Sequence, residues 1–162
     1  FDFTKIKDKN YSALFIRQTF AAEEMLIPAT PFEPVSGVGY SEFDGYGFVG
    51  EGERKITDRN GPDELRRDFA EGEESCEFVL DIPRGQYELL VISGDEEEDS
   101  VTCLNAVNGR KTGGEIIKKG CYQCKVIPIV QEKDEYLRLK ISTANGYRWK
   151  INAIFLNILR GY

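Results

Sequence analysis

The sequence of 162 residues contains no histidine. Without an imidazole, neither a Ser-His-Asp triad nor a Cys-His pair can supply the base that nucleophilic catalysis needs. Basic residues are also in the minority, because 21 Lys and Arg face 28 Asp and Glu for a net charge of −7. This acidity argues against phosphate-rich partners such as nucleic acid. No apolar run approaches the roughly 18 residues of a membrane-spanning helix, so no membrane segment is predicted.

Cysteine is scarce, with four residues at Cys76, Cys103, Cys121 and Cys124. Cys121 and Cys124 form a C-x-x-C pair, but zinc would need two further ligands, and no histidine is available. A redox motif should open a helix, whereas the residues after Cys121 have the composition of a strand. Two disulfides, with three possible connectivities, or buried free thiols remain open.

Convincing helical periodicity is missing, and two-residue alternation takes its place. Apolar side chains alternate along residues 76–82, and a second apolar segment covers residues 86–93. Pro83, Arg84 and Gly85 between them have turn chemistry. This pattern predicts a β-hairpin whose second strand is buried on both faces. We expect it at the centre of the fold.

About ten short segments have the composition of strands, and the turn signals between them are regular. The fold class is therefore predicted to be all-β, an antiparallel β-sandwich in which residues 1–162 form one domain. Residues 36–61 are predicted to be an ordered surface loop because they are rich in glycine and aromatics. Other expected segments are strands at 1–3, 11–20, 65–69, 101–107, 115–118 and 151–158, a second hairpin at 121–141, and a helical turn at 21–25.

Two sequence features bear on nucleotide binding or catalysis. Gly45–Gly50 satisfies G-x-G-x-x-G, but no amphipathic helix follows to face a pyrophosphate, so nucleotide binding is not predicted. Paired carboxylates could serve a glycosidase or lyase, but such enzymes need a deep cleft. The acidic residues cluster in expected loops, such as Asp95–Asp99, where solvation accounts for them. An enzyme is therefore not the favoured interpretation.

Aromatic side chains in the expected loops are the sharper functional signal. A sugar ring has an apolar C–H face that packs on a flat aromatic ring, while planar polar groups bind its hydroxyls. Tyr147 and Trp149, beside Gly146 and Arg148, are predicted to be exposed, whereas Phe48, Phe69, Phe78 and Phe155 are expected in the core. The candidate carbohydrate-binding residues are Tyr40, Tyr46, Arg66, Arg67, Tyr147, Arg148, Trp149 and Asn152.

Calcium is the one cofactor that the composition suggests. Hard cations bind carboxylate and carbonyl oxygens, and no twelve-residue calcium loop is present. The ligands would come from scattered positions, and Asp2, Asp68 and Asp95 are the candidates.

Several short motifs occur in a characteristic order along the chain. They include Gly45-Tyr46-Gly47-Phe48, Arg67-Asp68-Phe69, Asp81-Ile82-Pro83, Gly94-Asp95 and Asn152-Ala153-Ile154. In this order the sequence resembles the galactose-binding-like jelly-roll β-sandwiches appended to carbohydrate-active enzymes. It is most similar to modules that precede rhamnogalacturonan acetylesterases and related polysaccharide-degrading enzymes, and more distantly to malectin-like modules.

The resemblance implies a non-catalytic carbohydrate-binding module. Such a module would be a secreted, extracellular bacterial domain, monomeric, that holds a catalytic domain near plant cell-wall polysaccharide of pectic or hemicellulosic type. In related modules an Asn opening the last strand contacts the sugar, and Asn152 has that position here. Two alternatives remain open: a structural accessory domain that packs on a catalytic domain without binding sugar, and a small lyase or hydrolase.

Overall fold

The architecture is known from a computed structural model that describes residues 18–19, 39–42, 45–60, 62, 66–106, 110–133 and 135–161. These residues contain strands and no helix, so none of them forms a helix that could cross a membrane. The expected strands at 1–3 and 11–17 and the helical turn at 21–25 lie outside the described residues. The strands are β1 (Gln18–Thr19), β2 (Tyr46–Val49), β3 (Lys55–Asp58), β4 (Asp68–Gly72), β5 (Cys76–Ile82), β6 (Gly85–Asp95), β7 (Ser100–Ala106), β8 (Lys111–Ile117), β9 (Cys121–Gln131), β10 (Glu135–Ser142), β11 (Trp149–Ile151) and β12 (Ala153–Gly161).

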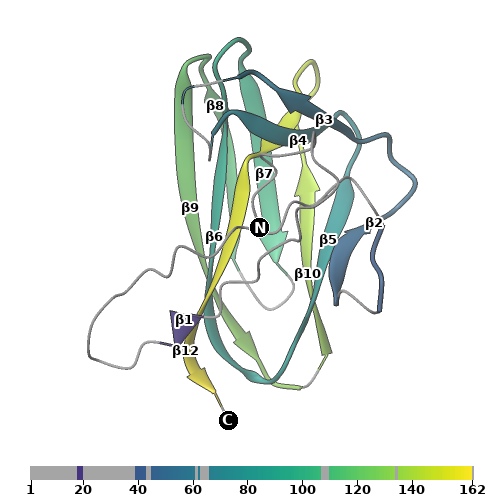
Figure 1. The fold of residues 1–162 in the computed structure, drawn as a ribbon, viewed down its shortest axis with the longest axis vertical. Coiled ribbons are helices and arrows are strands. Elements are labelled where there is room, and N and C mark those ends of the chain that lie inside the picture. The colour runs from purple at the N-terminus through teal and green to yellow at the C-terminus, as the bar shows by residue number, and fades with distance from the viewer. Residues whose placement is uncertain are drawn as a thin grey trace.

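Two larger sheets form the layers of the molecule (Figure 1). One has the order β1-β12-β6-β9 and the other the order β2-β5-β10-β7-β8. Their pairings are antiparallel, apart from the two-residue β1, which runs parallel to β12. A short third sheet, β11-β4-β3, lies at one end of the molecule, at the top of Figure 1. The predicted antiparallel β-sandwich is confirmed.

Alternation along each strand builds the core between the two larger sheets. On β10, Leu137, Leu139 and Ile141 are buried, while the side chains between them are exposed. On β6, Tyr87, Leu89 and Val91 face the same core from the opposite layer. Each such side chain contributes about 1.5–3 kcal/mol through burial, which fixes the strand register.

The predicted β5–β6 hairpin is wrong. β5 pairs with β2 and β10, whereas β6 pairs with β12 and β9, so Pro83 and Arg84 connect one layer to the other. The hydroxyl of Tyr87 donates a hydrogen bond of 2.5 Å to the carbonyl of Pro83 and ties this connection to the core. The second predicted hairpin fails in the same way, since β9 and β10 belong to different sheets.

Several smaller expectations also change. The face of β6 that carries Glu88, Leu90 and Ile92 is only partly buried, so this strand is not buried on both faces. The predicted loop at 36–61 contains β2 and β3 among its described residues. Phe48, Phe69 and Phe78 are core residues as predicted, whereas Phe155 is half-buried. The four cysteines are free thiols, and burial raises the pKa of Cys76 to about 12.

Candidate functional site

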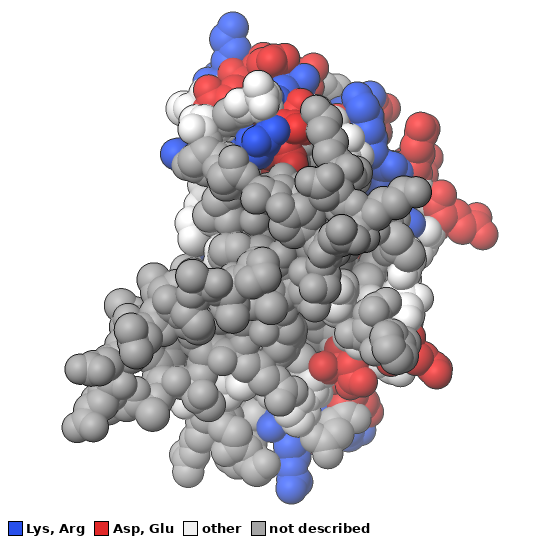
Figure 2. All heavy atoms as spheres, viewed as in Figure 1, with Lys and Arg blue, Asp and Glu red and all other residues white. Residues whose placement is uncertain are grey.

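A cleft of about 550 Å³ lies where three connections meet at the end of the molecule that carries the short sheet. The connections follow β4, β6 and β10. Charged side chains of both signs gather at this end in the space-filling view (Figure 2). The polar side chains that line the cleft are Glu73, Glu98, Asp99, Thr143, Asn145, Tyr147 and Arg148.

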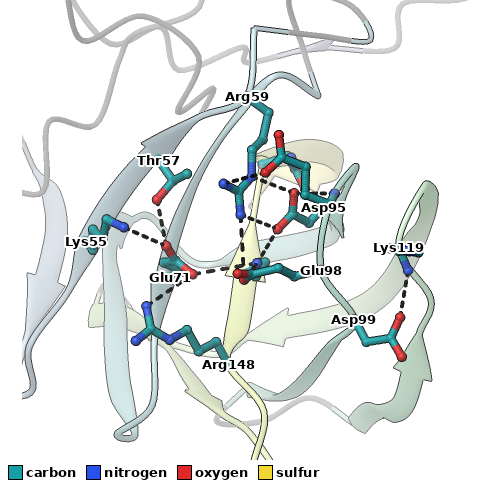
Figure 3. Close-up of polar contacts among 12 residues, drawn as sticks. Lys55, Thr57, Arg59, Glu71, Asp95, Glu98, Asp99, Lys119 and Arg148 are labelled. Atoms are coloured by element: carbon teal, nitrogen blue, oxygen red, sulfur yellow. Dashed lines mark hydrogen bonds and ion pairs between the residues drawn. The ribbon is translucent and has the colours of Figure 1, made fainter.

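Local hydrogen bonds fold two of these connections. In the first, the carboxylate of Asp95 accepts the backbone N–H of Glu97 at 3.1 Å, a turn for which Asp is well suited. The carboxylate of Asp99 accepts the backbone N–H of Lys119 at 2.9 Å, which ties this connection to the one before β9 (Figure 3). In the second, the N–H of Tyr147 donates to the carbonyl of Ala144 at 3.1 Å. Gly146 between them has a φ of 83°, a conformation that favours glycine.

Beneath the cleft, the ammonium group of Lys150 is fully buried, with 0% of the side chain exposed. It bonds the carboxylates of Asp95 and Glu98, the latter at 2.8 Å, and lies 3.7 Å from the carboxylate of Glu71. The ring of Phe69 lies 4.7 Å from the same nitrogen. A buried cation is tolerated only when carboxylates compensate its lost hydration, and Lys150 has three of them.

Asp95 also receives a two-pronged hydrogen bond from Arg59, at 3.0 and 3.1 Å (Figure 3). Burial by itself would raise the pKa of Asp95, but the bonds from Arg59 and Lys150 outweigh it and hold that pKa below its ordinary value. The Lys150 hydrogen bond likewise lowers the pKa of Glu98. A bond from Lys118, at 2.7 Å, lowers the pKa of Asp99.

These directions limit the chemistry of the cleft. A general acid needs a carboxyl group whose pKa is raised towards the working pH. The pKa values of Glu98 and Asp99 are lowered instead, so both side chains remain ionised hydrogen-bond acceptors at neutral pH. Fixed acceptors of this kind suit ligands that offer hydroxyl donors.

Arg148 forms one wall of the cleft and also borders a smaller hollow of about 300 Å³ on which Lys55 and Glu71 lie. Its guanidinium donates to a carboxylate oxygen of Glu73 at 2.8 and 3.1 Å. That hydrogen bond raises the pKa of Arg148, with the nearby charge of Glu71 as the next contribution. Glu71 itself accepts a 2.6 Å hydrogen bond from the hydroxyl of Thr57.

Two of the eight predicted carbohydrate-binding residues, Tyr147 and Arg148, lie in the cleft. The expected exposure of Trp149 is wrong: its ring is 0% exposed and its indole N–H donates to the carbonyl of Glu74 at 2.7 Å. Asn152 is buried too, and its amide group donates to the carbonyls of Arg66 and Asp68. Neither side chain offers a face to a ligand.

The other four predicted residues lie elsewhere. The guanidinium of Arg66 lies 5.1 Å from the ring of Tyr122, and Arg67 pairs with Asp58 at 2.9 Å. Tyr46 packs on Phe78 with 6.5 Å between ring centroids, at the edge of the core. Tyr40 contacts Tyr136 on the five-stranded sheet. The predicted residues therefore do not form one site.

Two of the three calcium candidates, Asp68 and Asp95, lie beside basic side chains. Asp95 is bound by Arg59 and Lys150, and Asp68 lies 3.5 Å from the guanidinium of Arg67. In the part of the chain that the structure describes, no three Asp, Glu or Cys side chains come together as a metal site would require. Asp2 lies outside the described residues, so calcium binding stays a prediction.

Sequence reasoning missed the acidic members of the cleft, which it assigned to solvated loops. A usable signal was present: Asp95–Asp99 follows a long apolar strand directly, and the Asn145-Gly146-Tyr147 segment also follows a strand. Connections at the same end of a sandwich meet in space. Lys150 was missed as well, although a lysine between Trp149 and Ile151 interrupts an apolar strand.

The pairing of Arg67 with Asp58 gives a titration that can be measured. The hydrogen bond from Arg67 lowers the pKa of Asp58 to about 2, from 3.8 in the unfolded chain. Because the folded-state pKa is the lower one, the pair stabilises the fold above pH 3.8 and this contribution is lost as the pH falls towards 2. We expect Arg67→Met to return the pKa of Asp58 towards 3.8, as measured by carboxyl NMR. An unchanged pKa in that variant would show that the pair does not form.

Comparison with known proteins supports the fold. No protein-family model matches the sequence, and no curated protein matches it. Among solved structures, protein YxiM from Bacillus subtilis superposes with a TM-score of 0.60 and 20% identity over 80% of this chain. The β-glucuronidase 2 of Bacteroides uniformis, bound covalently to cyclophellitol-6-carboxylate aziridine, gives a TM-score of 0.57 and 19% identity over 80% of this chain.

This chain spans only part of both proteins, 36% of YxiM and 16% of the β-glucuronidase. A third structure is TmCBM61 in complex with β-1,4-galactotriose. Its superposition includes 74% of this chain and 91% of TmCBM61, at 15% sequence identity. Its TM-score of 0.39 is too low to carry an argument. At these identities the likenesses show a shared fold.

Proposed function

We propose that this domain is a non-catalytic carbohydrate-binding module that holds an enzyme on plant cell-wall polysaccharide of pectic or hemicellulosic type. The observation that carries the proposal is the cleft lined by Tyr147, Asn145 and Arg148 together with ionised carboxylates. It combines one aromatic ring with fixed acceptors and donors, which is the combination that a sugar ring requires. As such modules are exported, the domain would act outside the cell.

Two further observations support this function. Two carboxylates of the cleft, those of Glu98 and Asp99, have lowered pKa values, which fits hydrogen-bond acceptors better than an acid catalyst. A domain of this fold also occurs as a minor part of a β-glucuronidase, a protein that acts on a sugar derivative. An accessory position beside a sugar-processing enzyme is therefore a reasonable setting for this chain.

Affinity-gel electrophoresis against rhamnogalacturonan, galactan, arabinan, xylan and galactomannan tests the proposal. We expect at least one polymer to retard the domain, and Tyr147→Ala to weaken binding about tenfold, equivalent to about 1.4 kcal/mol. Tyr147→Phe keeps the ring and should retain most of the affinity. Retardation by none of the polymers would contradict the proposal, and release of products from them would show an enzyme instead.

The second candidate is a structural domain that packs on a catalytic neighbour without binding sugar. One observation favours it: on the four-stranded sheet, Val126, Val130 and Leu159 are each about half exposed. Leu90 of β6 lies between Val126 and Phe155 in the strand register, so these apolar positions adjoin. Such a patch suits contact with another protein surface. Failure of every polymer to retard the domain would favour this candidate.

A further inference from the structure

Tyr136 is the one exposed aromatic side chain among the residues that the structure describes, with 43% of its surface accessible. It lies near the start of β10, on the outer face of the five-stranded sheet, next to the exposed Arg138 and Lys140 positions of the same face. The cleft borders the other end of β10, where Thr143 follows the strand. Tyr136 is therefore remote from the cleft, and the proposed function does not use it.

A second tyrosine holds the ring of Tyr136 from the side. Tyr40 meets it edge to face, with ring centroids 5.3 Å apart and an interplanar angle of 83°. The neighbouring Tyr136 side chain, followed by burial, raises the pKa of Tyr40 to about 12. A T-shaped contact with one neighbour helps to fix the Tyr136 ring and leaves at least one of its faces for stacking.

The backbone positions Tyr40 for this contact. Its N–H donates to the carbonyl of Phe48 at 2.9 Å, next to Gly47 of β2. A Cβ atom at Gly47 would lie 2.5 Å from the Cα of Tyr40, and the φ of Gly47 is 147°. The close approach of the two segments thus requires glycine, and it places Tyr40 beside the sheet face.

Polar groups surround this pair of rings. Asp81 is the cross-strand partner of Tyr136, and its charge acts on the Tyr40 hydroxyl. Arg138, the next outward side chain on β10, is about half exposed while it pairs with Glu77 at 2.9 Å. This setting differs from the apolar patch around Val126 on the other sheet. A contiguous apolar patch such as that around Val126 suits contact with another protein, whereas a sugar offers one apolar face and a rim of hydroxyls that fit an aromatic ring beside charged groups.

We propose that Tyr136, supported by Tyr40, is a second saccharide-binding platform on which one sugar ring stacks while Asp81 and Arg138 bind its hydroxyls. This inference rests on the proposed function, because the ligand is the same polysaccharide. Tyr136 and Thr143 are seven positions apart along an extended chain, a span of about 23 Å at roughly 3.3 Å per residue. A long polymer reaches both positions, whereas a trisaccharide occupies one. Engaging both raises the affinity for the polymer well above that for the short fragment.

The test compares Tyr136→Ala with the wild-type domain on the same five polysaccharides, and on a trisaccharide from whichever polymer retards the wild type. We expect affinity for the polymer to fall at least tenfold. The affinity of the same variant for the trisaccharide, which binds at the cleft and is measured by calorimetry, should equal that of the wild-type domain. Tyr136→Trp, which keeps an aromatic face, should retain polymer binding. Val126→Ala, an equally exposed substitution on the other sheet, serves as the matched control.

The outcomes separate this inference from the function on which it rests. Polymer binding that is lost in Tyr147→Ala but unchanged in Tyr136→Ala overturns the second platform and leaves the proposed function standing. No retardation of the wild-type domain by any of the polymers overturns both. An equal loss in Val126→Ala and Tyr136→Ala would also overturn the platform, because the effect would then not belong to this face. Unchanged melting temperatures confirm that each variant is folded.

Discussion

Replacing Lys150 by methionine is expected to lower the free energy of unfolding by about 3–5 kcal/mol. The ammonium group is fully buried and contacts the carboxylates of Asp95 and Glu98, with that of Glu71 at 3.7 Å. Methionine has a similar volume, so the packing against Phe69 is largely kept and the loss is electrostatic. The two buried carboxylates, those of Asp95 and Glu71, would then lose a cation that compensates their burial. Urea unfolding, followed by circular dichroism, measures the change.

Lys118→Met is the matched control for this prediction. Lys118 forms a hydrogen bond of similar length with Asp99, but two thirds of its side chain is exposed. Water and salt screen such a pair, so its removal should leave stability nearly unchanged. If both variants lost the same stability, or if Lys150→Met were as stable as the wild type, the prediction that the buried contacts of Lys150 stabilise the fold would be wrong.

The network also links stability to the cleft. Glu98 lines the cleft and bonds Lys150 below it, while Arg148 lines the cleft and pairs with both Glu71 and Glu73. Glu98 and Arg148 are therefore held by partners from β11 and β4, respectively. Such support keeps acceptors in place before binding, which reduces the entropy lost when a ligand is ordered. The acidic cluster is thus more than a solvated loop.

Sequence patterns predicted the faces of the strands better than their partners. Alternation along β5 identifies the side of that strand that faces the core, whereas β6, predicted to be buried on both faces, fully buries only the face of Tyr87, Leu89 and Val91. The same alternation is produced by a hairpin and by two strands that face each other across a sandwich. Pro83 and Arg84 provide turn chemistry for either arrangement. The choice depends on pairings such as β5 with β10, whose residues are more than fifty positions apart.

The site was harder to predict for a related reason. Lys150 can be buried because the carboxylates of Asp95, Glu98 and Glu71 lie around it, and these residues are distant from it in sequence. No local sequence pattern around Lys150 predicts these partners. Tyr147 lies in a loop as predicted, because Gly146 marks a turn and turns lie at the ends of a sandwich, but its side chain is partly buried. Asn152 was predicted to contact sugar, but it lies in the interior. Its amide group donates hydrogen bonds to backbone carbonyls there, a role that its sequence neighbours do not reveal.

Trp149 shows how one long-range pairing changes the role of a residue. Its neighbours Gly146 and Arg148 suggested a loop, but Trp149 pairs with Gly72 across the short sheet. A Cβ atom at Gly72 would lie 2.7 Å from the indole ring, so only glycine leaves the space that the ring occupies. Phe48 lies against the same ring at 6.2 Å between centroids. The indole is therefore a core element between β4 and β2.

Trp149→Ala is accordingly expected to cost about 3–5 kcal/mol of unfolding free energy, because it leaves a large cavity and an unused Glu74 carbonyl. Trp149→Phe should recover part of that loss. Since Trp149 is the single tryptophan, its fluorescence reports directly on this position, and the native emission should be that of a buried indole. Urea unfolding of both variants measures the energies.

Two comparisons distinguish this packing role from a direct contact with sugar. Gly72→Ala leaves Trp149 present but displaces its ring, so it should shift the emission of Trp149 towards the red and lower stability. Tyr147→Ala, two residues away and in the cleft, should reduce polysaccharide binding with little loss of stability. A Trp149→Ala variant as stable as the wild type, but unable to bind polysaccharide, would reverse the two assignments. In that case the indole, and not Tyr147, would provide the aromatic face that the proposed function requires.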